Sequence, residues 1–95
     1  MDISKSDIVM SAAGRDAGKL FYVLKVEGSF AYLVDGKIRK LESPKRKKLK
    51  HIRFVARSDT RVACKIQQDE PLLNSELRRD LAIFGQEKVR TKEAE

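Results

Sequence analysis

One segment of the chain concentrates side chains that bind phosphate. Residues 37–53 carry nine Lys and Arg residues and one acid, Glu42, which gives 9 − 1 = +8, whereas the rest of the chain has 12 basic and 13 acidic residues, a net charge of −1. A block of cations held on a folded scaffold attracts polyanions, and nucleic acid is the commonest of these in a cytosol. We expect the following cations to contact phosphate: Lys37, Arg39, Lys40, Lys45, Arg46, Lys47, Lys48, Lys50 and Arg53. The alternative is a solubilising loop.

A second group of residues forms a glycine-bearing loop. Gly14 and Gly18 lie four residues apart in a loop at residues 13–19 between two apolar stretches, and glycine lets a backbone turn tightly. Arg15 and Lys19 are placed to project toward a phosphate backbone. The spacing matches neither a Walker loop nor a dinucleotide-binding fingerprint, so nucleotide chemistry is not indicated.

The chain has few of the residues that usually carry catalysis or bind metals. The chain has one His and one Cys, a poor start for a zinc site. His51 lies among lysines, so we expect it on the basic face with the phosphate-binding residues, without a base's orienting partner. Cys64 alternates with Val62 and Ile66, which predicts a buried, inert thiol. We expect no enzyme activity, no metal and no cofactor.

Short strands must position these groups. Period-two or near-continuous apolar patterns predict strands at residues 7–12, 20–26, 30–34, 37–41, 51–55 and 61–67. The 20–26 run suggests burial on both faces, and Asp35-Gly36 predicts a two-residue hairpin turn with positive φ at both positions. Residues 45–50 are expected to form a basic loop that serves as the main phosphate clamp. Short strands with short turns indicate a small barrel or sandwich.

The pattern becomes helical near the C-terminus. Leu73, Leu77, Leu81 and Phe84 have helical spacing, which predicts a helix over residues 74–84. The expected N-cap is Asn74, with Gly85 as the stop. We assign residues 1–68 to the barrel, 69–86 to a helix in the same domain and 87–95 to a polar flexible tail. The helix packs on the barrel in one interpretation and docks on a partner protein in the other.

Size and composition fit one small domain without membrane segments. A chain of 95 residues suits a single core. No stretch approaches the roughly 18 to 20 consecutive apolar residues that cross a bilayer, and residues 1–5 lead into no secretory apolar run. One cysteine fits a reducing compartment, so we expect a cytoplasmic protein. The basic segment also has few apolar residues to insert into lipid.

The strand–loop–strand unit at residues 8–26, with Gly14, Arg15, Gly18 and Lys19, resembles a KOW motif. Phe21 stands where many KOW loops carry a further glycine. Over about residues 5–55 the chain resembles the archaeal and eukaryotic large-subunit ribosomal protein fourteen family. The resemblance rests on Phe21 at this position, on the later Leu-Val-Asp-Gly at 33–36 and on the basic segment that follows. The resemblance implies a mainly β, SH3-like small barrel that binds RNA, with ribosomal RNA as the partner.

Several functions remain open at this stage. The first is an RNA-binding protein of the large ribosomal subunit or its assembly, a monomer off the RNA, with ribosomal proteins as further partners. The alternatives are an SH3-like protein-interaction module and a KOW-type transcription- or translation-associated factor that binds nucleic acid away from the ribosome. Tyr22, Phe30 and Tyr32 have two interpretations: their place in strand runs favours positions in the core, and the alternative is that they stack on bases.

Overall fold

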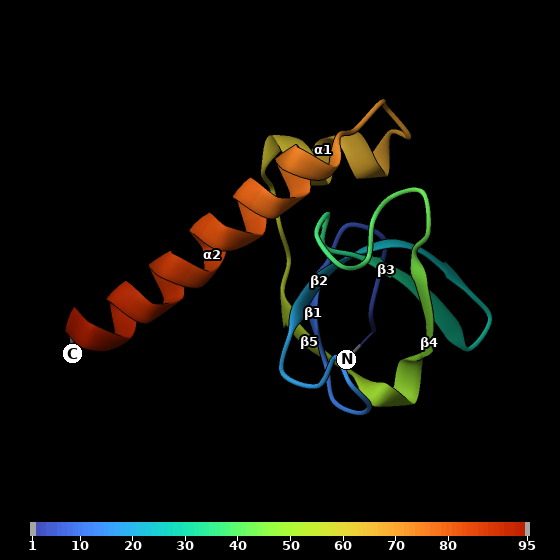
Figure 1. Cartoon of the computed structure of the whole chain (residues 1–95), viewed down its shortest axis with the longest axis horizontal. Helices are drawn as coiled ribbons and strands as arrows, with labels where there is room; N and C mark the ends of the chain where they lie inside the picture. The colour runs from blue at the N-terminus through green and yellow to red at the C-terminus, as the bar shows by residue number, and fades with distance from the viewer. Residues whose placement is uncertain (1, 95) are drawn as a thin grey trace.

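The computed structural model describes residues 2–94, with side chains described through residue 86. The chain is mainly β, as expected, with five antiparallel strands in the order β4-β3-β2-β1-β5 (Figure 1). The elements in chain order are β1 (Ile8–Ser11), β2 (Leu20–Glu27), β3 (Phe30–Val34), β4 (Lys45–Lys48), the 3-10 helix η1 (Leu49–His51), β5 (Ile52–Ala56), α1 (Arg61–Gln67) and α2 (Asn74–Ala94).

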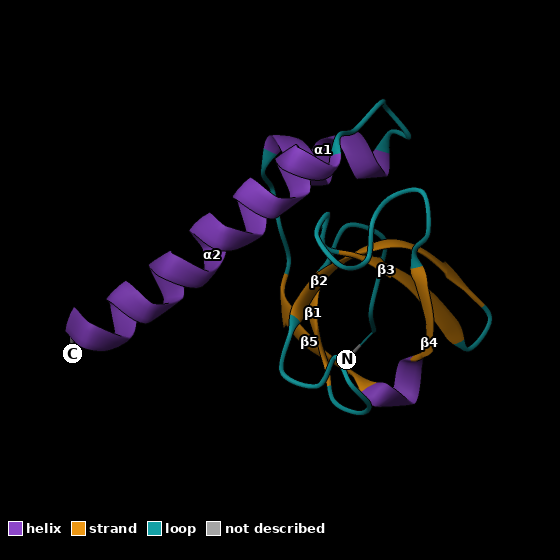
Figure 2. Ribbon diagram, in the orientation of Figure 1, coloured by secondary structure: helices purple, strands orange, loops and turns teal. Residues whose placement is uncertain are grey.

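The sheet curls so that its two edge strands face each other across the short η1 segment (Figure 2). Neighbouring strands pair in sequence from β4 to β5, but no ladder joins β4 to β5 within residues 2–94. The architecture is therefore a curled antiparallel sheet with two helices.

Alternate side chains of the strands feed two apolar clusters. Val9, Phe21 and Leu33 belong to one cluster, and their neighbours in the chain point to the opposite face. The second cluster lies under the helices and contains Ile8, Tyr22, Val34, Val62, Ala63, Ile66, Leu77 and Leu81. Burial on both faces, expected for residues 20–26, is confirmed at the start of β2.

The strand expected at residues 61–67 is wrong, because this segment is helix α1. The Thr60 hydroxyl caps the helix by accepting a hydrogen bond from the Ala63 N–H at 3.3 Å. Val62, Ala63 and Ile66 are buried at helical spacing. Cys64 lies on the other side and is exposed, so the expected burial of its thiol is also wrong.

The second helix begins where the sequence predicted but runs further. Gly85 does not end α2, which continues to Ala94 and extends away from the sheet (Figure 1). Leu77 and Leu81 are 0% and 9% exposed and pack in the cluster beneath the helices, whereas Leu73 is exposed. The helical backbone spans residues 87–94 of the expected flexible tail, whose side chains lie outside the described part of the chain.

The predicted two-residue turn at Asp35-Gly36 is a wider loop. The Asp35 Oδ1 atom accepts three hydrogen bonds, from the backbone N–H groups of Lys37, Ile38 and Arg39, with N–O distances of 2.8–3.1 Å. Gly36 has a φ of +77°, whereas the φ of Asp35 is not positive, contrary to the prediction. Residues 37–41 therefore form no strand, and the chain returns to the sheet at β4.

Candidate nucleic-acid interface

The glycine loop between β1 and β2 is compact and hydrogen-bonded. Gly14 and Gly18 have φ values of +79° and +85°, which L side chains rarely adopt. The Gly18 N–H donates to the Ser11 carbonyl at 2.8 Å, and the Lys19 N–H donates to the Asp16 carbonyl at 3.0 Å. Arg15 and Lys19 are exposed, in the position that the sequence assigned to them. Phe21, three residues after Gly18, is buried and packs in the core.

An ion pair joins this loop to the basic segment. Arg39 donates to Asp16 Oδ2 through Nε at 3.1 Å and through Nη2 at 2.9 Å. Asp16 is only 5% exposed, so the guanidinium supplies charge compensation that water does not. Arg39, one of the cations predicted to contact phosphate, thus links the two loops in the structure.

A lysine of β4 makes a second tie. Lys47 Nζ donates to the Ala13 carbonyl at 2.5 Å and lies beside Gly14, where an added Cβ would be 3.5 Å away. Because side chains alternate along a strand, Lys45 and Lys47 are half-buried on one face of β4, whereas Arg46 and Lys48 are exposed on the opposite face. The expected basic loop at residues 45–50 is therefore a strand followed by η1, and its cations diverge.

The outward side of β4 meets two aromatic rings. The Arg46 guanidinium carbon lies 4.2 Å from the ring centroid of Phe30, and Lys25 Nζ lies 4.6 Å from that of Tyr32. Both rings are half-buried on the surface, so their predicted core position is wrong. Tyr22 is fully buried, as predicted.

The last cations of the basic segment face a different surface. Lys50 and Arg53 line a groove of about 550 Å³, whose other lining residues are Asp2, Ile3, Leu49, Ile52 and Phe54. His51 is exposed, and its carbonyl accepts a hydrogen bond from the Ala12 N–H at 2.8 Å. The structure thus places the predicted site residues on adjoining surfaces rather than in a single cleft.

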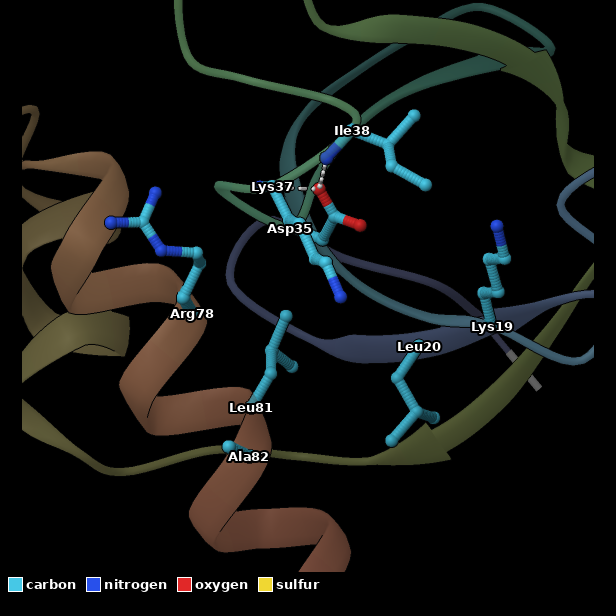
Figure 3. Close-up of a pocket in the computed structure, with 8 residues that line it drawn as sticks. All are labelled: Lys19, Leu20, Asp35, Lys37, Ile38, Arg78, Leu81 and Ala82. Carbon is cyan, nitrogen blue, oxygen red and sulfur yellow. Dashed lines mark hydrogen bonds between the residues drawn. The ribbon is translucent and has the colours of Figure 1, made fainter.

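Sequence reasoning missed a groove of about 610 Å³ between the sheet and α2. Figure 3 shows Lys37 extending between Arg78 on α2 and Leu20 at the start of β2. The Arg78 Nη1 atom donates to the Gly36 carbonyl at 2.6 Å. The remaining lining residues are Lys19, Asp35, Ile38, Leu81 and Ala82. No local pattern predicts this groove, because it joins segments about sixty residues apart in sequence. Lys40 lies nearby in sequence and is exposed.

Among the side chains that the structure describes, in residues 2–86, no three His, Cys, Asp or Glu groups gather in an arrangement that could hold a metal ion. No helix within the described backbone, residues 2–94, has the length and apolar character to cross a bilayer. In comparisons with known proteins, no family model and no curated protein matches the chain. The site is therefore interpreted from its own geometry.

Proposed function

We propose that this chain is an RNA-binding protein of the KOW type that engages structured RNA through its basic surface. The proposed target is ribosomal RNA in the large subunit, in a structural or assembly role. Lys and Arg side chains of this kind respond to backbone charge and shape more than to base identity.

One observation supports the proposal: side-chain contacts fasten the basic segment to the glycine loop, so both are ordered parts of one scaffold. The Arg39–Asp16 and Lys47–Ala13 contacts fix the two parts against each other. These contacts engage two cations, and Lys45 is half-buried, whereas the remaining cations are exposed. The exposed cations are Arg15, Lys19, Lys37, Lys40, Arg46, Lys48, Lys50 and Arg53.

The fold supports the KOW, SH3-like part of the proposal. Five short antiparallel strands curl on themselves, and a single 3-10 turn links the edge strands β4 and β5. The glycine loop joins β1 to β2, the place where a KOW motif has its strand–loop–strand unit. An SH3-like barrel is the arrangement that this order of elements favours.

Charge reversal on exposed cations tests RNA binding. The double variant Lys48→Glu with Lys50→Glu is expected to bind a folded ribosomal RNA fragment at least about tenfold more weakly in filter-binding titrations, since two phosphate contacts become repulsions. The matched control is Arg61→Glu with Arg79→Glu, which changes the net charge equally on exposed helix positions. Equal affinity of the two variants for RNA would contradict the proposal.

Sucrose-gradient fractionation of native lysate tests the ribosomal target. We expect comigration with the large subunit at low salt and release at high salt, because contacts with phosphate weaken as ionic strength rises. If the chain binds RNA in titrations but stays at the top of both gradients, it is a nucleic-acid-binding factor separate from the ribosome.

The groove of Figure 3 favours protein interaction as a second candidate function. Leu20, Ile38 and Leu81 give the groove an apolar lining, and Ile38 is 54% exposed. Apolar side chains of this kind contact a protein partner rather than phosphate. Under this function, an Ile38→Glu variant loses its partner in pull-down assays and keeps its affinity for RNA. The Lys48→Glu, Lys50→Glu variant shows the opposite pattern.

A further inference from the structure

The outward face of β3 carries two aromatic rings that the core does not use. Phe30 and Tyr32 alternate with Ala31 and Leu33, which are both 0% exposed and point to the opposite face. Neither ring belongs to the two apolar clusters of the protein. Two residues apart on a strand, they stand about 7 Å from each other along β3.

Cations from both neighbouring strands flank these rings. Arg46 and Lys48 on β4 lie opposite Tyr32 and Phe30 in the strand register, and Lys25 on β2 lies opposite Tyr32. Directly opposed residues share a face of the sheet, so the five side chains form one surface. We call Lys25, Phe30, Tyr32, Arg46 and Lys48 the aromatic face.

The charge of the aromatic face suits a polyanion. Glu27, the acid opposite Phe30, pairs with Lys25 at 3.3 Å. The hydrogen bond from Lys25 and that from Tyr32 lower the pKa of Glu27, so the carboxylate stays ionised at neutral pH. With three cations and one acid, the surface has a net charge of 3 − 1 = +2.

We propose that the aromatic face binds unpaired nucleotides, with bases stacked on Phe30 and Tyr32 and phosphates held by Arg46 and Lys48. This inference rests on the proposed RNA binding and names the part of the RNA that the surface recognises. Aromatic rings stack on bases whose faces are free, which a duplex does not offer. Arg46 and Lys25 lie over the rings in the free protein. On stacking, Arg46 turns from Phe30 to a phosphate, whereas Lys25 keeps its pair with Glu27.

The test compares a single-stranded oligoribonucleotide containing 2-aminopurine with a duplex of the same length. Phe30→Leu with Tyr32→Leu removes both rings and retains apolar side chains. We expect its affinity for the single strand to fall at least about tenfold, with loss of the 2-aminopurine quenching that stacking produces. Its affinity for the duplex and its salt dependence are expected to stay at the wild-type values, since all cations remain.

The aromatic exchange Phe30→Tyr with Tyr32→Phe is the matched control, because it keeps two rings and is expected to preserve both affinity and quenching. Circular dichroism checks that all variants fold. If the leucine variant binds and quenches like wild type, the inference is overturned while RNA binding stands. If wild type itself binds neither RNA, both the proposed function and the inference fail.

Discussion

At the scale of single residues, the phenol of Tyr22 connects the sheet to both helices. Its hydroxyl donates to the Asp80 carboxylate on α2 and lies 2.8 Å from Ser58 Oγ and 3.3 Å from Thr60 Oγ1, the cap of α1. Burial and the hydrogen bond to Asp80 raise the pKa of Tyr22 to about 12. The neutral phenol is thus the form that the folded protein stabilises.

This shift predicts a stability limit at high pH. The folded pKa lies above the ordinary value of 10, so the stabilisation is complete below pH 10 and is lost as pH rises toward 12. In a Tyr32→Phe variant, phenolate absorbance is expected to titrate with a midpoint near 12 in the native protein and near 10 in denaturant. A native midpoint at 10 would contradict the buried hydrogen-bonded phenol.

The Arg39–Asp16 pair gives a second prediction. Arg39→Ala leaves the buried carboxylate without its partner, so we expect a loss of about 1–3 kcal/mol in the free energy of unfolding, measured by urea denaturation. Arg39→Lys is expected to restore only part of it, because an ammonium lacks the guanidinium fork. Lys40→Ala, at an exposed neighbour, is the control and should stay within about 0.5 kcal/mol of wild type.

At the scale of elements, the sequence predicted the strands of the central hairpin well. Residues 30–34 match β3, and residues 20–26 match β2 except for its last residue. Both segments are rich in β-branched and aromatic residues, and β2 is buried on both faces at its start. The local sequence pattern and the tertiary packing therefore favour the same structure.

Helix α1 was missed because its pattern fits two periods. Val62 and Ile66 are four residues apart, which suits one face of a helix and also one face of a strand, and seven residues cannot separate these cases. The Thr60 cap was the available signal. The loop after β3 was missed for a different reason. Three backbone N–H groups donate to the Asp35 carboxylate there, and these hydrogen bonds depend on the folded path of residues 35–39, which the Asp-Gly pair alone does not specify.

The seating of α2 gives an element-scale prediction. Gly36 has a φ of +77°, and an added Cβ would lie 2.2 Å from the Asn74 carbonyl oxygen at the start of the helix. We expect Gly36→Ala to destabilise the fold by about 2–5 kcal/mol through backbone strain and displacement of α2. Gly28→Ala is the matched control, because its φ is also positive but nothing lies within 4 Å of the added Cβ. It should cost about 1–2 kcal/mol; equal costs in thermal unfolding would show that α2 is not seated on Gly36.

At the scale of the whole molecule, the sequence showed which segment carries the positive charge, but not which way its cationic side chains point. The net +8 of residues 37–53 was visible by counting. Which cations are free was not, because Arg39 and Lys47 find partners in a loop more than twenty residues earlier. The aromatic face also escaped prediction, since only strand pairing shows which side of β3 meets Arg46 and Lys48.

The distribution of free cations predicts a steep salt dependence of RNA binding. If about six of them contact phosphates, the logarithm of the binding constant should fall with the logarithm of salt concentration with a slope of about −4. The Lys48→Glu, Lys50→Glu variant should reduce the magnitude of this slope by about 1.4, whereas Arg61→Glu with Arg79→Glu should leave it unchanged. Titrations from low to high salt measure both, and a flat wild-type profile would refute phosphate binding.

The position of β4 at an edge of the sheet has a consequence for solubility. An edge strand leaves one row of backbone N–H and C=O groups free to pair with a strand of another molecule, which is a common start of aggregation. All four residues of β4 are Lys or Arg, so two copies repel each other at this edge. If RNA binds at this edge as proposed, it neutralises that repulsion and covers the strand at the same time, so the edge is guarded against strand pairing with and without RNA.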